Sequence, residues 1–278
     1  MNNFQTFKIN IKDKIMYVTF DFPPVNIQGI PMINDLNILC DDLENNQDIK
    51  VVVFQSANPE IFIAHADIDM LKDLSTESVP KDKVVLSPLQ TTLNRISKLP
   101  QATIAKIEGI ARGGGHEFAL ACDMRFAAKG KAVFMQMEVG MGVLPCGGGA
   151  SRMARQTGLG KALEIILSAQ DFGADEAESF GTINRAIAPN EITQYVDKLA
   201  DRISKFPFNS IKNCKKMISS SIDMPIDDAL LLESYYLYQC TSTTPAVQRF
   251  KKASESNFQN SLENQRNFES LLMTMQDN

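Results

Sequence analysis

Residues 106–123 read KIEGIARGGGHEFALACD, and this stretch decides how the rest of the chain is interpreted. A strand runs into three consecutive glycines, and residues 116–121 then have the composition of a helix. Consecutive glycines let the backbone turn sharply and bring its N–H groups close to a ligand, and the helix adds a positive end that favours an anion. Glu117 falls in the first helical turn, where it could act chemically or simply stabilise the helix. This segment alone supports both interpretations equally.

A second glycine-rich stretch follows at residues 133–155, VFMQMEVGMGVLPCGGGASRMAR. Glu138 lies among apolar and small residues, so we expect desolvation to raise its pKa toward the range useful for proton transfer. The alternative is that Glu138 points to solvent, as glutamates commonly do. Residues 147–149 predict another junction between a loop and a helix. GxxxxGK[ST], GxGxxG and GxSxG are all absent, which disfavours a usual nucleotide-phosphate site and a serine hydrolase.

Outward from these stretches, short β-branched segments alternate with helical patterns as far as about residue 190. This alternation predicts an α/β fold with parallel strands and crossover helices. After residue 190 the chain predicts helices and hardly any strand. The expected strands are residues 9–20, as a hairpin turning near Asp13-Lys14, and residues 50–55, 103–108 and 124–127.

The composition of the 278 residues is that of an ordinary globular protein, with 44% hydrophobic and 22% charged residues. Five scattered cysteines without a CxxC pair indicate reduced thiols. The presence of only two histidines argues against a histidine-rich metal centre, and we expect no metal. A net charge of −5 without a basic run argues against nucleic-acid binding. No apolar stretch predicts a membrane span, and no leader pattern is visible, so a cytoplasmic protein is expected.

Taken together, three stretches resemble the crotonase superfamily, the enoyl-CoA hydratase/isomerase family. They are PEIFIAHADID at residues 59–69, GGGHEFALACD at 113–123 and FMQMEVGMGVLPCGGGASR at 134–152, in the family's order and spacing. With Pro24-Val25-Asn26 upstream and the helical C-terminus, the resemblance covers nearly the whole chain. It implies a crotonase-like spiral of ββα units at residues 1–190, responsible for acyl-CoA binding and catalysis. Residues 191–278 would form a helical region for oligomerisation.

The resemblance also implies the site residues. The backbone N–H groups of Ala66 and Gly114 would form an oxyanion hole, which stabilises the negative charge that develops on a thioester oxygen. Glu117 would help deprotonate a water that attacks C3, and Glu138 would give a proton to C2. Coenzyme A would be held by the loop and the glycine turn, including backbone carbonyls of the loop: Ala64, His65, Ala66, Asp67, Ile68, Gly113 and Gly114.

The implied activity is that of an enoyl-CoA hydratase, which adds water across the 2,3 double bond of a 2-enoyl-CoA thioester and needs no further cofactor. Alternatives are a Δ3-Δ2-enoyl-CoA isomerase, another thioester-enolate enzyme of this fold, or a non-catalytic acyl-CoA-binding protein. A homotrimer or a dimer of trimers is implied. Three residues depart from the family pattern: His65 and Cys146 replace usual glycines, and Asp69 replaces a residue that is often basic. The length and type of the acyl group depend on the shape of a pocket lined by residues 72–93 and 139–144.

Overall fold

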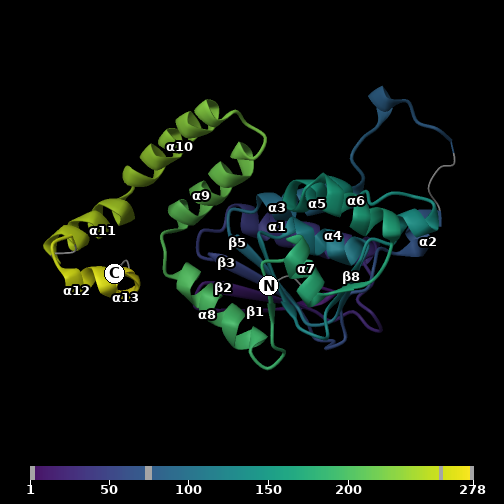
Figure 1. The fold of residues 1–278 in the computed structure, drawn as a ribbon, viewed down its shortest axis with the longest axis horizontal. Coiled ribbons are helices and arrows are strands. Elements are labelled where there is room, and N and C mark those ends of the chain that lie inside the picture. The colour runs from purple at the N-terminus through teal and green to yellow at the C-terminus, as the bar shows by residue number, and fades with distance from the viewer. Residues whose placement is uncertain (1–3, 73–76, 257–258, 276–278) are drawn as a thin grey trace.

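The computed structural model describes residues 4–72, 77–256 and 259–275 and has two β-sheets flanked by helices (Figure 1). The larger sheet has the strand order β1-β2-β3-β5-β7-β10, and the smaller sheet has the order β4-β6-β8-β9. Pairing is parallel except for β1 with β2 and β8 with β9. The strands are β1 (Phe7–Lys12), β2 (Ile15–Phe20), β3 (Val51–Ser56), β4 (Ile61–Ile63), β5 (Ala102–Ile107), β6 (Ile110–Arg112), β7 (Met124–Ala128), β8 (Val133–Met135), β9 (Phe172–Gly173) and β10 (Arg185–Ile187).

Helices follow the strands and then make up the C-terminal part of the chain. The predicted hairpin is confirmed: Asp13 and Lys14 form its turn with φ values of 49° and 67°, the left-handed conformation that a two-residue hairpin turn uses. The helices are α1 (Ile30–Glu44), α2 (Ile68–Lys72), α3 (Pro88–Lys98), α4 (Gly114–Ala121), α5 (Gly149–Thr157), α6 (Leu159–Ser168), α7 (Ala174–Phe180), α8 (Ile192–Ser204), α9 (Phe208–Ser221), α10 (Ile226–Thr241), α11 (Thr244–Glu255), α12 (Leu262–Arg266) and α13 (Phe268–Thr274), with 3-10 turns η1 (Lys81–Lys83) and η2 (Glu138–Met141).

The two sheets grow together, because each repeat of the chain adds one strand to both. The pairs β3–β4, β5–β6 and β7–β8 each place their first strand in the larger sheet and their second in the smaller one, and a helix follows each pair. Neighbours in each sheet therefore come from successive repeats. This arrangement confirms the predicted α/β fold with a spiral of ββα units. It also brings the loops that end each repeat to one side of the molecule.

Aromatic packing fixes α4 against both sheets. The ring of Phe118 lies 5.0 Å from that of Phe54 and 5.3 Å from that of Phe20, both edge-on, and it also contacts Phe62 of the smaller sheet. All four rings are buried in one core. Aromatic pairs in this geometry contribute about 0.5–1.5 kcal/mol each beyond the area that they bury. The helix that carries Glu117 is therefore anchored by its next residue.

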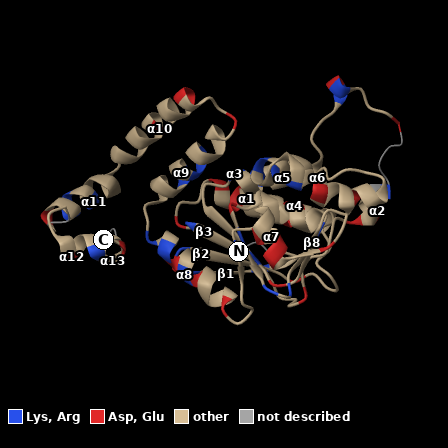
Figure 2. Cartoon of the chain, in the orientation of Figure 1, with Lys and Arg blue, Asp and Glu red and all other residues tan. Residues whose placement is uncertain are grey.

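The C-terminal helices beyond α8 extend away from the sheets (Figure 1). α8 itself packs on the larger sheet through Ile192, Val196 and Ala200, which are fully buried. α9 and α10 form an antiparallel pair, followed by α11, α12 and α13. Acidic and basic side chains are interspersed along the helices (Figure 2). Within the described residues, no helix is long and apolar enough to cross a membrane.

Candidate active site

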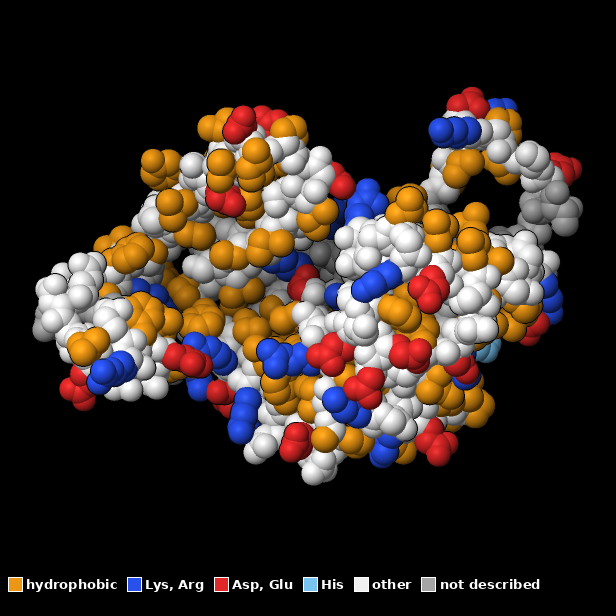
Figure 3. Space-filling model, viewed as in Figure 1, with side chains coloured by type: hydrophobic (Ala, Val, Ile, Leu, Met, Phe, Trp, Pro, Cys, Tyr) orange, Lys and Arg blue, Asp and Glu red, His pale blue; other side chains and the backbone are white. Residues whose placement is uncertain are grey.

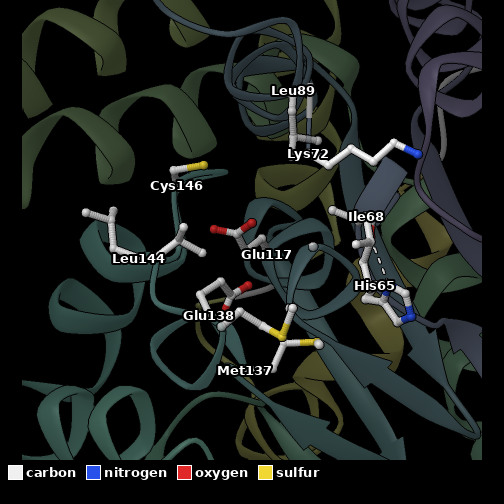
Figure 4. A pocket seen from close by; sticks show the side chains of 14 residues that line it. His65, Ile68, Lys72, Leu89, Glu117, Met137, Glu138, Leu144 and Cys146 are labelled. Carbon is white, nitrogen blue, oxygen red and sulfur yellow. Dashed lines mark hydrogen bonds between the residues drawn. The ribbon is translucent and has the colours of Figure 1, made fainter. Parts of the chain in front are cut away.

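A cavity of about 330 Å³ lies where the loops of successive repeats meet. Its walls are mostly apolar, and two carboxyl groups reach into it (Figure 4). The labelled side chains come from the loop after β4, from α2, α3 and α4, and from the segments around η2. The lining residues are His65, Ala66, Ile68, Lys72, Leu89, Gly113, Gly114, Glu117, Met137, Glu138, Met141, Val143, Leu144 and Cys146.

Glu117 lies in the first turn of α4 and is 3% exposed. The backbone N–H of Gly149 donates a hydrogen bond of 2.8 Å to its Oε1. Burial raises the pKa of Glu117 to about 7, and the nearby charge of Glu138 raises it further, whereas the N–H groups of Gly149 and Gly147 oppose the shift. A carboxyl group with a pKa near 7 can both accept and release a proton at neutral pH.

The second glycine cluster is shaped around this carboxyl group. A β-carbon on Gly147 would lie 2.5 Å from Glu117 Oε2, and one on Gly149 would lie 2.8 Å from Oε1. Both distances are shorter than a van der Waals contact, so only glycine permits the backbone to approach the carboxyl group this closely. The predicted junction between loop and helix is confirmed, since α5 begins at Gly149.

Glu138 is the first residue of η2, and Gln136 and Met137 separate it from the end of β8. The side chain is half-buried, and its Oε2 is buried without a hydrogen-bond partner among the described residues. Burial raises the pKa of Glu138, as its apolar surroundings predict. The carboxyl group therefore faces the cavity and not bulk solvent, and its protonated form is favoured.

His116 and Gln136 hold the two glutamate-bearing segments together. Both are fully buried, and their side chains form a 3.2 Å hydrogen bond between His116 Nδ1 and Gln136 Nε2. Burial lowers the pKa of His116 to about 3, so its ring is neutral. His116 precedes Glu117, and Gln136 lies two residues before Glu138. This pair consequently links the helix of one glutamate to the strand end of the other.

The predicted N–H donors, Ala66 and Gly114, both line the cavity and lie beside each other. A β-carbon on Gly114 would lie 3.0 Å from the backbone nitrogen of Ala66. Gly114 is the first residue of α4, where N–H groups have no partner within the helix. Within the described residues, the backbone hydrogen bonds of these loops do not engage either N–H group. The arrangement can accept an oxygen atom between two donors.

The loop expected to hold coenzyme A is fixed by hydrogen bonds to its backbone carbonyls. The carbonyl of Ala64 accepts a hydrogen bond from Arg112 N, that of His65 accepts one from Gln28 N, and that of Ala66 contacts His65 Nδ1 at 2.8 Å. Each carbonyl keeps a second lone pair for a ligand.

Not all of the residues expected to bind coenzyme A line the cavity. Ala66, His65, Ile68, Gly113 and Gly114 line the cavity, whereas Ala64 and Asp67 do not. Ala64 is buried, and the carboxylate of Asp67 accepts a hydrogen bond from Asp69 N.

Lys72 lines the cavity and is the first residue of the segment 72–93 that was expected to surround the acyl group, although no role was predicted for it. It is exposed at the end of α2, and its Nζ lies 2.7 Å from Asp69 Oδ1. The signal available in the sequence was the spacing of three residues from Asp69, which places both side chains on one face of a helix. Asp69 stands where the family often has a basic residue, and Lys72 supplies a positive charge about one helical turn later.

The apolar wall agrees in part with the segments expected to surround an acyl group. Leu89 lies within residues 72–93, and Met141, Val143 and Leu144 lie within 139–144; residues 73–76 are outside the described part of the chain. Cys146 is an exposed residue whose thiol lines the cavity, and partial desolvation there, followed by the charges of Glu117 and Glu138, raises the pKa of the thiol. No group of three or more His, Cys, Asp or Glu side chains within the described ranges is arranged to hold a metal ion.

With the fold and this geometry in place, comparison with known proteins decides the family. The profile described as enoyl-CoA hydratase/isomerase matches residues 10–273. The chain belongs to this family. Membership confirms the predicted crotonase superfamily and, with the spiral of ββα units, the fold class.

Relatives within the family include hydratases. The chain is 31% identical to the short-chain-enoyl-CoA hydratase of Clostridium acetobutylicum, over 83% of this chain and 87% of the relative. It is also 31% identical to the crotonyl-CoA hydratase of Syntrophomonas wolfei, over 70% and 74% of the two chains. The crystal structure of an enoyl-CoA hydratase from Bacillus anthracis shares the fold at 24% identity, with a TM-score of 0.83 over 91% of this chain and 97% of that one.

Proposed function

We propose that this protein is an enoyl-CoA hydratase that adds water across the 2,3 double bond of a 2-enoyl-CoA thioester to give a 3-hydroxyacyl-CoA. The observation that carries the proposal is the meeting of Glu117 and Glu138, both with a raised pKa, in one cavity that Ala66 and Gly114 also line. The similarity to named hydratases supports the same reaction.

In the proposed reaction, the active form of the site is the one in which the two carboxyl groups share one proton. Two carboxyl groups in one site titrate as a pair, so the first ionisation leaves one base and one acid. Glu117 as carboxylate takes a proton from water while the water oxygen bonds to C3. Protonated Glu138 gives its proton to C2. The product therefore gains one oxygen and two hydrogens, and transfer of a proton from Glu117 back to Glu138 restores the starting state.

The thioester oxygen would lie between the N–H groups of Ala66 and Gly114. As the C3–O bond forms, the electrons of the double bond move toward this oxygen and build an enolate. Two preorganised donors stabilise this charge more than they stabilise the neutral thioester, and the loss of such a donor typically costs about 3–4 kcal/mol of transition-state stabilisation. The coenzyme A portion would act as a handle that positions the acyl group, held along residues 64–68, and no further cofactor takes part.

Purified protein with crotonyl-CoA tests the proposal through the loss of enoyl absorbance. Glu117→Gln and Glu138→Gln should each lower kcat for hydration by at least about 100-fold, whereas Glu60→Gln, on an exposed loop, should not change it. If Glu117→Gln keeps most activity on a 3-enoyl-CoA and the wild type does not hydrate crotonyl-CoA, the protein is an isomerase with one catalytic carboxylate. Tight binding of coenzyme A thioesters without turnover would instead identify an acyl-CoA-binding protein.

We also propose assembly into a homotrimer or a dimer of trimers through the C-terminal helices. Apolar side chains remain exposed along these helices in the single chain (Figure 3). Leu231, Tyr238 and Phe250 are 72%, 71% and 64% exposed. Exposed apolar surface of this extent is typical of a face that another subunit covers. Light scattering coupled to size-exclusion chromatography should give three or six times the mass of one chain. The mass of a monomer would contradict the proposed assembly.

A further inference from the structure

Arg152 of α5 holds the glycine loop that faces the carboxyl group of Glu117. Its Nη1 donates a 3.0 Å hydrogen bond to the carbonyl of Gly147, and its backbone N–H donates a 2.8 Å hydrogen bond to the carbonyl of Gly148. A β-carbon on Gly148, whose φ is 106°, would overlap the guanidinium group of Arg152. The side chain and the backbone of one residue therefore fix two successive glycines of this loop.

The N–H groups of the same loop contact Glu117. The N–H of Gly149 donates a 2.8 Å hydrogen bond to Glu117 Oε1, and the N–H of Gly147 also favours the ionised carboxyl group. The loop thus contacts Glu117 through its N–H groups and Arg152 through its carbonyl groups. Because Gly147 takes part on both sides, the place where Arg152 holds its carbonyl also determines where the loop meets Glu117.

The positive charge of Arg152 is not used in an ion pair. Among the described residues, no Asp or Glu side chain forms a salt bridge with it, and Asp123, which lines the same groove behind α4, is bound by Lys215 at 2.8 Å. The guanidinium is half-buried, but an arginine stays protonated in proteins. Its charge therefore acts on Glu117, and the charge of Glu117 acts on it in turn.

No other group around Glu117 supplies an equivalent charge within the described part of the chain. Glu138 raises the pKa of Glu117, whereas Arg152 lowers it. The remaining titratable groups near this carboxyl group are the neutral ring of His116, the protonated thiol of Cys146, and Lys72, which is ion-paired in the same cavity. An opposite charge close to a carboxyl group favours its ionised form.

We propose that Arg152 is a positioning residue for Glu117: it holds residues 147–149 so that their N–H groups meet the carboxylate, and its charge favours the ionised form of that carboxylate. Arg152 does not line the cavity, so it acts through the loop and through its charge and not on the substrate. This inference rests on the proposed function, in which Glu117 accepts a proton from water.

The first test compares Arg152→Met and Arg152→Lys with Arg155→Met, the same substitution at an exposed arginine of the same helix. In Arg152→Met, kcat for crotonyl-CoA should fall about 10- to 100-fold. The acid limb of its kcat/KM profile should move up by about one pH unit, because Glu117 keeps its proton longer. Arg152→Lys retains the charge, so its acid limb should stay near that of the wild type, and Arg155→Met should change neither quantity. A lower kcat in Arg152→Met with an unmoved acid limb would leave Arg152 a structural role only and would overturn the inference.

A second readout needs no turnover. Infrared difference spectra between each protein and its Glu117→Gln counterpart isolate the carboxyl band of Glu117, and titration of this band follows its ionisation. Arg152→Met should move the titration up by about one pH unit, and Arg155→Met should not move it. If the wild type does not hydrate crotonyl-CoA, the proposed hydration fails while this titration still tests Arg152.

An unchanged titration of Glu117 in Arg152→Met would overturn the inference. If Arg152→Met does not fold, Arg152→Gln takes its place, because it also removes the charge and keeps a donor for the Gly147 carbonyl. Failure of all three Arg152 variants to fold would likewise overturn the inference, since the arginine would then serve the fold and not the carboxylate.

Discussion

Replacing Glu117 by Gln should make the protein more stable at alkaline pH even though it removes the proposed base. Glu117 is buried and its pKa is raised to about 7 from an ordinary value of 4.5. Below pH 4.5 the group is protonated in both the folded and the unfolded chain. As pH rises from 4.5 to about 7, only the unfolded chain loses the proton, so the free energy of unfolding falls. Above about 7 both states are ionised, and the loss stays constant.

The magnitude follows from the width of this pH window. A difference of one pKa unit corresponds to about 1.4 kcal/mol, so ionised Glu117 lowers the free energy of unfolding by about 3 kcal/mol at pH 8. Glutamine keeps an acceptor for Gly149 N, but only one of its two terminal atoms can accept, so the N–H of Gly147 loses its partner. This loss costs about 1 kcal/mol. The net gain at pH 8 should therefore be about 2 kcal/mol.

Thermal unfolding of the wild type and Glu117→Gln at pH values between about 4 and 8 measures this difference. A gain of about 2 kcal/mol corresponds to a rise in melting temperature on the order of 5 °C for a chain of this size. The gain should disappear by about pH 4.5, where the variant should be slightly less stable than the wild type. Glu60→Gln, on the exposed loop, should follow the wild type at every pH. A difference that does not change with pH, or a lower melting temperature at pH 8, would refute the assigned burial of an ionisable Glu117.

Three further predictions concern activity. Because Glu117 must be ionised to accept a proton from water, kcat/KM should fall as pH drops through about 7, and a profile flat to about pH 5 would contradict this role. Gly149→Ala places a β-carbon 2.8 Å from Glu117 Oε1 and should lower kcat about 100-fold. Gly160→Ala, which meets open space, is its control, and equal activity of the two variants would count against the packing argument. Lys72→Ala should raise KM for an anionic coenzyme A thioester about 3- to 10-fold with little change in kcat, and an unchanged KM would exclude Lys72 from binding.

Much of the architecture could be predicted from the sequence because the strands of the larger sheet are long enough to show a pattern. The strands predicted at residues 50–55 and 103–108 are β3 and β5, each displaced by one residue. The strands β4 and β6 of the smaller sheet have three residues each, and β9 has two. Segments this short show no periodicity, so they could not be found by pattern alone. The spiral arrangement came from the resemblance and not from the pattern.

Only part of the site could be predicted from the sequence. Glu117 was placed in a first helical turn by the glycines before it, and the raised pKa of Glu138 was expected from its apolar neighbours. By contrast, Gln28 approaches Gly114 only because a backbone bridge pairs it with Ala66. That contact joins residues far apart in the chain and follows from tertiary structure alone. For the same reason, the link between His116 and Gln136 had no signal in the sequence.

The central claim is that the cavity adds water to an enoyl thioester, and isotope incorporation tests it most directly. Crotonyl-CoA is incubated with the protein in oxygen-18 water that also carries deuterium, and the product is analysed by mass spectrometry. We expect a 3-hydroxyacyl-CoA with one oxygen-18 at C3 and one deuterium at C2, formed by the wild type and not by Glu117→Gln. If no 3-hydroxyacyl-CoA with oxygen-18 at C3 forms, whether or not the enoyl thioester takes up deuterium, hydration is contradicted as the function of this protein.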